Sequence, residues 1–262
     1  MSEKFGVRLK WLGCACFELD FGGVTFVNDP FVTDNTWMGL TWENVEKCDY
    51  ITVTHTHFDH ITDLPALVEK HRPYILCGER AAWELMHWAD LNPLTMYPMY
   101  PDQELDFDSV KVKALYGRHV LRGGPDATLG RLIERARNMP ALAGRQDLLD
   151  MVPCGEFEYN NFLYTLPNGT KILIWGNRLD RPDQRNILRQ LNPDIAIMQM
   201  TSNSASDTVS ICMEMGCKVL IPNHFDFPQS HMDLVLETKK EAEKRAPAIQ
   251  YIIPEYGQWI DL

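Results

Sequence analysis

Long apolar runs are missing from this sequence. No stretch approaches the roughly 18 to 20 consecutive apolar residues that a bilayer crossing requires, and the mean hydropathy is -0.25. Residues 1–6 also lack the apolar core and the small-residue cleavage site of a secretory signal. We therefore expect a soluble protein that stays in the cytoplasm and does not bind a membrane.

An excess of positive charge is missing too. The chain has 25 Lys and Arg residues against 36 Asp and Glu residues, which gives a formal net charge of -11. Nucleic-acid binding depends on clustered Lys and Arg side chains that release counterions from the phosphate backbone. Nucleic acid is therefore not an expected partner.

Paired cysteine motifs are a third absence. The seven cysteines are scattered, none forms a C-x-x-C pair, and an odd number cannot form a complete set of disulfides. We expect reduced thiols, most of them buried.

The pattern of elements predicts an α/β protein with one domain, residues 1–262. Strand-like runs separated by turns open the chain, and strands alternate with helices afterwards. The expected strands are 7–12, 16–20, 24–28, 50–54, 74–77, 110–116, 161–166, 170–175, 195–199, 219–221 and 250–253, and the expected helices are 64–71, 79–89, 182–191, 205–215 and 232–245. Residues 96–101 look like an ordered surface connection. Segment 117–158 breaks the alternation with helical runs at 127–137 and 145–151, and we interpret it as a helical lid insertion.

The segment Val53-Thr54-His55-Thr56-His57-Phe58-Asp59-His60 places four potential metal ligands within six residues. Side chains alternate along a strand, so His55 and His57 should project to the same side, and Asp59 and His60 follow as the chain turns toward a helix. Surface histidines are the alternative interpretation, but such dense spacing favours a metal site at the end of a strand.

The spacing H-x-H-x-D-H resembles the signature of the metallo-β-lactamase superfamily. His119, in ALYGRHV, and His224, in VLIPNHFDFP, resemble two later ligand positions of that family. The motifs Trp11-Leu12-Gly13 and Asp29-Pro30-Phe31 resemble the branch of ascorbate-6-phosphate lactonase-like, metal-dependent hydrolases. The resemblance implies a four-layered αβ/βα sandwich with one or two metal ions at the edge of its two sheets.

The resemblance also implies two sets of metal ligands: His55, His57 and His119 for one ion, and Asp59, His60 and His224 for the other. Asp29 would support the site from behind, although an aspartate before a proline also suits a plain turn. Zinc is the first expectation, with manganese or iron as alternatives, because imidazole and carboxylate suit all three. Such ions make hydroxide available from bound water at neutral pH, and Asp59 would be the catalytic residue that orients it and carries its proton.

The sequence departs from the family pattern at Asn177. Family members carry a strand ending in Gly-Asp, whose aspartate bridges the two metals, whereas this chain has Gly176-Asn177. An amide oxygen is a weaker ligand than a carboxylate, so a single ion becomes an alternative, with Asp180 as a candidate substitute ligand. Cys14 is a second departure. Its thiol could be a ligand or a nucleophile, but a free cysteine is more often an inert buried residue, and we favour that interpretation.

Arginines suggest the class of substrate. Segment 118–145 contains six arginines and two acids, and further arginines follow the Gly176-Asn177 turn. Because guanidinium groups bind carboxylate and phosphate in a bidentate way, we expect Arg118, Arg122 and Arg178 to bind a small anionic substrate. The alternative is that these arginines lie on solvated helix faces and pair with acids.

The sequence therefore predicts a metal-dependent hydrolase that acts on a small anionic lactone, ester, amide or phosphodiester. Three alternatives stay open, because one fold hosts many reactions: an iron-dependent oxidoreductase, a phosphodiesterase of compact nucleotides, and a noncatalytic metal-binding protein. A homo-oligomer is also left open.

Overall fold

The computed structural model describes residues 5–119, 128–201 and 203–262. Arg122, one of the expected substrate-binding residues, lies outside the described residues.

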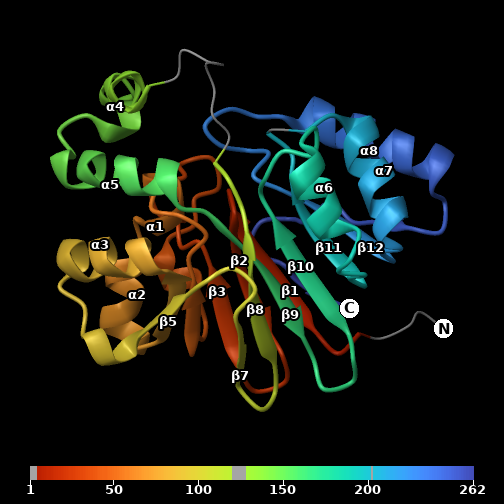
Figure 1. Cartoon of the computed structure of the whole chain (residues 1–262), viewed down its shortest axis with the longest axis horizontal. Coiled ribbons are helices and arrows are strands. Elements are labelled where there is room, and N and C mark those ends of the chain that lie inside the picture. Colours follow the sequence, from red (N-terminus) through yellow and green to blue (C-terminus); the bar gives the residue numbers. More distant parts are fainter. Residues whose placement is uncertain (1–4, 120–127, 202) are drawn as a thin grey trace.

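Two seven-stranded sheets, as far as the described residues show, form the centre of the molecule (Figure 1). The first sheet has the order β14-β1-β2-β3-β4-β5-β6, and the second has the order β13-β12-β11-β10-β9-β8-β7. The strands of the first are β1 (Arg8–Gly13), β2 (Cys16–Asp20), β3 (Thr25–Asn28), β4 (Tyr50–Thr52), β5 (Tyr74–Gly78), β6 (Met96–Met99) and β14 (Trp259–Asp261). Those of the second are β7 (Glu104–Asp106), β8 (Lys111–Tyr116), β9 (Asn160–Thr165), β10 (Lys171–Trp175), β11 (Ile195–Gln199), β12 (Val219–Asn223) and β13 (Gln250–Tyr251).

Helices cover the outer face of each sheet (Figure 1). On the side of the first sheet lie α1 (Phe58–Ile61), α2 (Leu64–His71), α3 (Glu79–Ala89), α4 (Leu129–Arg137) and α5 (Gln146–Phe157). On the side of the second lie α6 (Pro182–Leu188), α7 (Ala205–Met215) and α8 (Met232–Arg245). Short 3-10 turns are η1 (Trp42–Asn44), η2 (Pro93–Thr95) and η4 (Pro140–Leu142). Among the described residues, no helix combines the length and the apolar character needed to span a bilayer.

Alternating side chains on the strands separate the layers. In β11, Ile195 and Ile197 belong to the apolar cluster between the sheets, whereas Ala196 and Met198 belong to the cluster under the helices of the second sheet. A third apolar cluster lies between the first sheet and its helices. Successive side chains of a strand point to opposite faces of the sheet, and here both faces are covered, so each strand contributes to two apolar layers. The predicted four-layered αβ/βα sandwich is confirmed.

The strands direct several loops to one edge of the two sheets. β3 and β4 are parallel, and so are β10, β11 and β12. The carboxyl ends of parallel strands meet at the same edge, where loops can assemble a binding site. The residues that follow such strand ends include Asp29, His55, His119, Asn177 and His224.

Two expectations about elements were wrong. Residues 96–99, expected to be part of a surface connection, form the edge strand β6, which contains Pro98. An edge position tolerates the missing N–H of proline. α5 continues through Pro153 to Phe157, beyond the expected end at residue 151. The proline removes one helical hydrogen bond, but α5 buries Leu148 and Met151 against the protein, and this packing holds the helix together.

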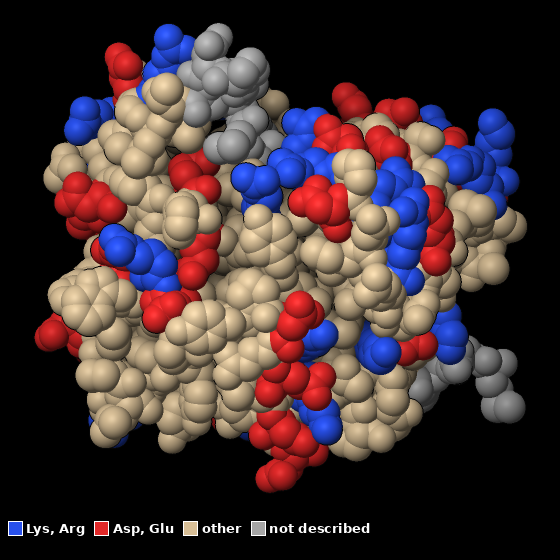
Figure 2. Space-filling view, viewed as in Figure 1, with Lys and Arg blue, Asp and Glu red and all other residues tan. Residues whose placement is uncertain are grey.

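Acidic and basic side chains alternate over the helices of the second sheet (Figure 2). Glu214 of α7 pairs with Arg185 of α6 at 2.9 Å and with Arg189 at 2.7 Å. Surface pairs of this kind contribute little to stability, but they neutralise arginines that would otherwise attract anions.

Candidate metal centre

The strand expected at 50–54 ends two residues early, and the histidine motif that follows it lies in a loop and the first turn of a helix. β4 ends at Thr52, and α1 begins at Phe58 with His57 at its N-cap position. The two side chains nevertheless converge, with 3.1 Å between His55 Nε2 and His57 Nδ1. Asp59 and His60 occupy the first turn of α1. The turn into the helix therefore brings these four side chains close together.

One group of potential metal ligands consists of His55, His57 and His119. One donor atom from each lies within 4.8 Å of the other two. His119 comes from the loop after β8, in the other sheet, and its ring centroid lies 4.4 Å from that of His57. The structure thus brings together the three residues predicted for the first ion.

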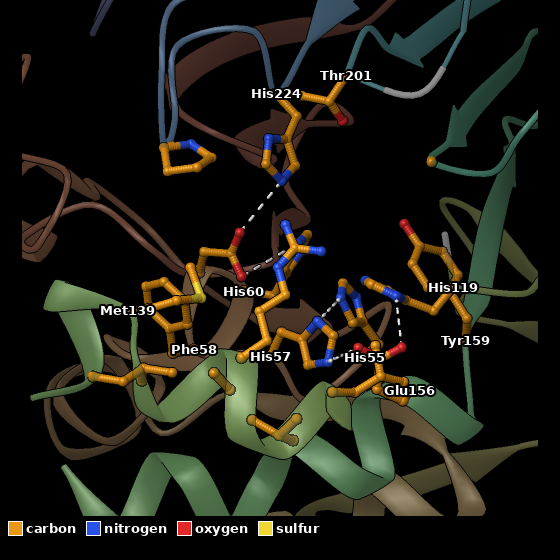
Figure 3. A pocket seen from close by; sticks show the side chains of 18 of the residues that line it. His55, His57, Phe58, His60, His119, Met139, Glu156, Tyr159, Thr201 and His224 are labelled. Carbon is orange, nitrogen blue, oxygen red and sulfur yellow. Dashed lines mark hydrogen bonds and ion pairs between the residues drawn. The ribbon is translucent and has the colours of Figure 1, made fainter. Parts of the chain in front are cut away.

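A second group consists of Cys14, Asp59 and His224, again with donor atoms within 4.8 Å of one another. His224 Nε2 lies 3.4 Å from Asp59 Oδ2 (Figure 3). His60, which was predicted for this ion, lies between the groups. Its Nε2 is 3.9 Å from Asp59 Oδ1, and its ring centroid is 4.0 Å from that of His55.

Asp29 lies behind the motif, as the resemblance implied. Its Oδ2 is 2.9 Å from His60 Nδ1, and it accepts hydrogen bonds from the backbone N–H of Thr54 at 2.7 Å and from the Thr54 hydroxyl at 2.8 Å. Burial favours the neutral ring of His60, but Asp29 and Asp59 raise its pKa. Asp29 therefore fixes both the loop and the direction of the His60 ring.

The protonation states suit metal binding. Burial and the neighbouring His60 lower the pKa of His55 well below its usual value, and burial and His119 do the same for His57. Burial opposes the charge of Asp59, but His60 and His224 hold its pKa below the usual range. Neutral imidazoles and an ionised carboxylate are the forms that bind a divalent ion.

The atoms that face one another in the two groups also fit a metal. His55 Nε2 lies 3.1 Å from His57 Nδ1, and His224 Nε2 lies 3.4 Å from Asp59 Oδ2. Ligands of one metal ion lie at such separations, because each is about 2.0 to 2.3 Å from the ion. The donor set of imidazole and carboxylate groups fits zinc, manganese or iron.

Glu156 is a site residue that sequence reasoning missed. It comes from α5, and its two oxygens face two different histidines: Oε1 lies 3.6 Å from His57 Nε2, and Oε2 lies 3.0 Å from His119 Nδ1 (Figure 3). Because His57 Nδ1 faces His55, its Nε2 is the nitrogen turned away from the first group. A histidine that binds metal usually donates its other N–H to a carboxylate. Glu156 lies where such a carboxylate is needed for both rings.

Comparison with known proteins also supports a metal site. Residues 27–139 match the family described as the beta-lactamase superfamily domain. A UPF0173 metal-dependent hydrolase from Koribacter versatilis is 38% identical over 80 residues, which cover 30% of this chain and 34% of that protein. One from Flavobacterium johnsoniae is 27% identical over 124 residues, which cover 47% and 53%. The matched part thus spans between about a third and a half of these relatives.

Solved structures match over nearly the whole chain. Igni18, a metallo hydrolase from Ignicoccus hospitalis, has a TM-score of 0.71 at 15% identity and is covered to 98%, as is this chain. YhfI from Bacillus subtilis, a metallo-beta-lactamase fold protein, has a TM-score of 0.65 at 13% identity and covers 98% of this chain and 99% of its own. Residues 27–139 thus resemble the beta-lactamase superfamily domain, and the chain as a whole has the metallo-β-lactamase fold. Its place in the lactonase-like branch stays a prediction.

Asn177, for which the resemblance implied a bridging position, does not join either group of ligands. Its Nδ2 donates to the backbone oxygen of Arg118 at 2.6 Å, and its Oδ1 accepts a hydrogen bond from Asn161 Nδ2. Both ends of the amide are therefore occupied. Asp180, the suggested substitute, is half exposed and pairs with Arg178, so the structure does not bring it to the histidines. Neither residue fits the ligand role that the sequence suggested.

The metal centre opens into a cavity of about 180 Å³. One face of α4 and the turn after it line the cavity with Leu132, Arg135, Ala136 and Met139, at the i, i+3, i+4 and i+7 spacing of a helix face. In Figure 3 Met139 lies on the opposite side of the cavity from Tyr159. The described part of the lid thus supplies an apolar wall that contains one cation, Arg135.

Two of the three arginines predicted to bind substrate lie outside this cavity. Arg118 and Arg178 line a neighbouring cavity of about 240 Å³, which shares His119 with the first. Arg178 Nε donates to Asp180 Oδ1 at 2.9 Å, so its charge is already paired. Arg135, by contrast, forms no ion pair within the described part of the chain. The sequence indicated the arginine-rich segment but could not select the arginine that faces the site.

Proposed function

We propose that this protein is a hydrolase that uses one or two divalent metal ions, with zinc as the first choice. The observation that carries the proposal is the convergence of two groups of metal donors, His55, His57 and His119 on one side and Asp59 and His224 on the other, at one cavity. Relatives named metal-dependent hydrolases support it, as does the fold shared with a metallo hydrolase.

The residues have distinct tasks in such a reaction. Bound metal ions lower the pKa of water and polarise the group under attack. Asp59 belongs to the second donor group and lines the cavity. Its ionised carboxylate can accept the proton that water gives up. Burial, with Asp29 nearby, raises the pKa of Tyr159, so its hydroxyl stays protonated. Figure 3 shows that hydroxyl directed toward the cavity, where it can donate to an oxygen that gains negative charge.

The cavity supports a small amphipathic anion as substrate. A volume of about 180 Å³ suits a small molecule. Phe58, Leu132 and Met139 provide contact for an apolar group. Arg135, which forms no ion pair within residues 5–119, 128–201 and 203–262, provides a partner for a carboxylate or phosphate. We therefore propose a lactone, ester, amide or phosphodiester with an apolar part and an anionic group.

The test is to measure substrate turnover by protein whose metal content is known. Zinc-, manganese- and iron-loaded protein would be assayed against small anionic lactones, esters, amides and phosphodiesters, each beside its neutral analogue. His55→Ala and His57→Ala should lower kcat/KM by more than about 100-fold, since even the outer partners of ligands cost about 10–100-fold. His87→Ala, on the exposed surface of α3, is the matched control and should leave the rate unchanged.

Other outcomes identify the alternatives. Metal binding without turnover of any substrate would favour a noncatalytic protein. Bound iron with oxygen consumption would favour an oxidoreductase. Either result contradicts the proposed hydrolase.

A further inference from the structure

Cys14 lies inside the second group of metal donors. It occupies the turn between β1 and β2, and its side chain is fully buried. Together with Asp59 and His224 it offers three donor atoms within 4.8 Å of one another. Ligands bound to one zinc at about 2.0 to 2.3 Å lie about 3.3 to 3.8 Å apart at a tetrahedral angle. A small contraction around an ion would therefore bring the sulfur, the carboxylate and the imidazole into its coordination sphere.

The backbone fixes Cys14 beside His224. The N–H of His224 donates to the carbonyl oxygen of Cys14 at 2.8 Å. The N–H of Cys14 donates to Asp226 Oδ1 at 3.0 Å, and Asp226 is held in turn by Asn35 Nδ2 at 2.8 Å and by the Tyr256 hydroxyl at 3.2 Å. Two loops that are far apart in the sequence are thus locked together where the donors meet. A donor that is held in place in advance is what a structural ligand requires.

Charge gives a reason for a thiolate at this place. The resemblance implies a metal-binding carboxylate at position 177, but here Asn177 is neutral and its amide is bonded to Asn161 and Arg118. That leaves Asp59 as the anion of the second group. A thiolate at Cys14 would restore the missing negative charge, and a bound divalent ion stabilises the thiolate form.

We propose that Cys14 is a ligand of the second metal ion, in a site formed with Asp59 and His224. This inference rests on the metal centre of the proposed function. When the metal binds, the S–H bond breaks, a sulfur–metal bond forms and the proton passes to solvent. Thiolate ligands select zinc or cobalt over manganese or magnesium, so the second position would bind the softer ions.

Cobalt substitution tests this ligand directly, because a thiolate bound to Co²⁺ produces a charge-transfer absorption band that imidazole and carboxylate do not. Metal-free full-length protein would be titrated with Co²⁺ and the band recorded per ion bound. The band should be present in the wild type and in His57→Ala, which disrupts only the first group, and absent in Cys14→Ser with one cobalt ion fewer per chain. Cys16→Ser is the matched control, because Cys16 is equally buried and belongs to neither group.

A second measurement needs no variant and so does not depend on how well Cys14→Ser folds. X-ray absorption by the zinc-loaded wild type should show a sulfur neighbour at about 2.3 Å. A spectrum with only nitrogen and oxygen neighbours, or a cobalt band that persists in Cys14→Ser, overturns the proposal. Hydrolysis measured in parallel separates the two claims, since turnover without sulfur ligation overturns the role of Cys14 and leaves the hydrolase intact.

Discussion

Asn177 shows how a single atom changes the role of a position. With an amide in place of a carboxylate, the side chain can donate to the backbone of Arg118 while it accepts from Asn161. Asn161 also accepts from the N–H of Gly176 through its Oδ1. Asn177 therefore ties the end of β10 to the loop that carries His119. Position 177, where the resemblance implied a bridging aspartate, thus supports the loop that carries His119.

Asn177→Asp should destabilise the protein without adding a metal ion. The new carboxylate would face the Arg118 carbonyl, so a donor would be replaced by an acceptor in a buried place, at a cost of about 1–3 kcal/mol. Urea unfolding and metal content measured on the same sample test both parts. Asn186→Asp, on the exposed surface of α6, is the matched control for added charge. A gain in bound metal would show that residue 177 can still act as a ligand.

At the scale of elements, α5 connects the lid to the metal centre. Gly155 allows the close approach, because a Cβ added there would lie 2.5 Å from His57 Cδ2. The next residue, Glu156, then reaches both His57 and His119. One helix thus holds ligands that come from two different sheets.

Glu156→Gln and Glu156→Ala should weaken metal binding at the first group by about 10–100-fold, because the two histidines lose the carboxylate that orients them. Competition with a chromophoric chelator measures the affinity directly. Asp150→Asn, on the exposed side of the same helix, should have no effect. Equal affinities in all four proteins would contradict the positioning role of Glu156.

Gly155→Ala should push α5 away from His57. Overpacking of this kind costs about 1–3 kcal/mol in the free energy of unfolding, and metal affinity should fall with it. Gly130→Ala in α4 is the control, because a Cβ there meets nothing within 4 Å, and it should stabilise the protein by about 0.5–1 kcal/mol. Thermal unfolding of the metal-free variants separates the two results. Similar shifts at both positions would mean that α5 does not depend on a glycine.

The sequence predicted those parts of the structure that depend on local pattern. Alternation located most strands, and the spacing of the motif located His55, His57 and Asp59. Glu156 and Arg135 could not be found in this way, because their importance depends on how closely the lid helices approach the histidines. The place of Cys14 beside Asp59 and His224 could not be found either, for the same reason. Nothing in its neighbours along the chain shows that the loop of His224 lies against it.

At the scale of the whole molecule, the metal centre depends on the packing of two sheets. His55 and Asp59 follow a strand of the first sheet, whereas His119 and His224 follow strands of the second. Near this edge the ring of Trp11 stacks on Phe225 at 4.6 Å between centroids and joins the two halves. The donors of each ion can meet only when the two sheets are packed against each other. Metal binding therefore requires the complete fold.

We infer that a metal ion is bound where the two sheets meet. Anomalous X-ray diffraction from zinc-loaded crystals, recorded on both sides of the zinc absorption edge, tests it most directly. We expect one peak enclosed by His55, His57 and His119 and a second enclosed by Cys14, Asp59 and His224. A map with no peak between the three histidines would contradict it.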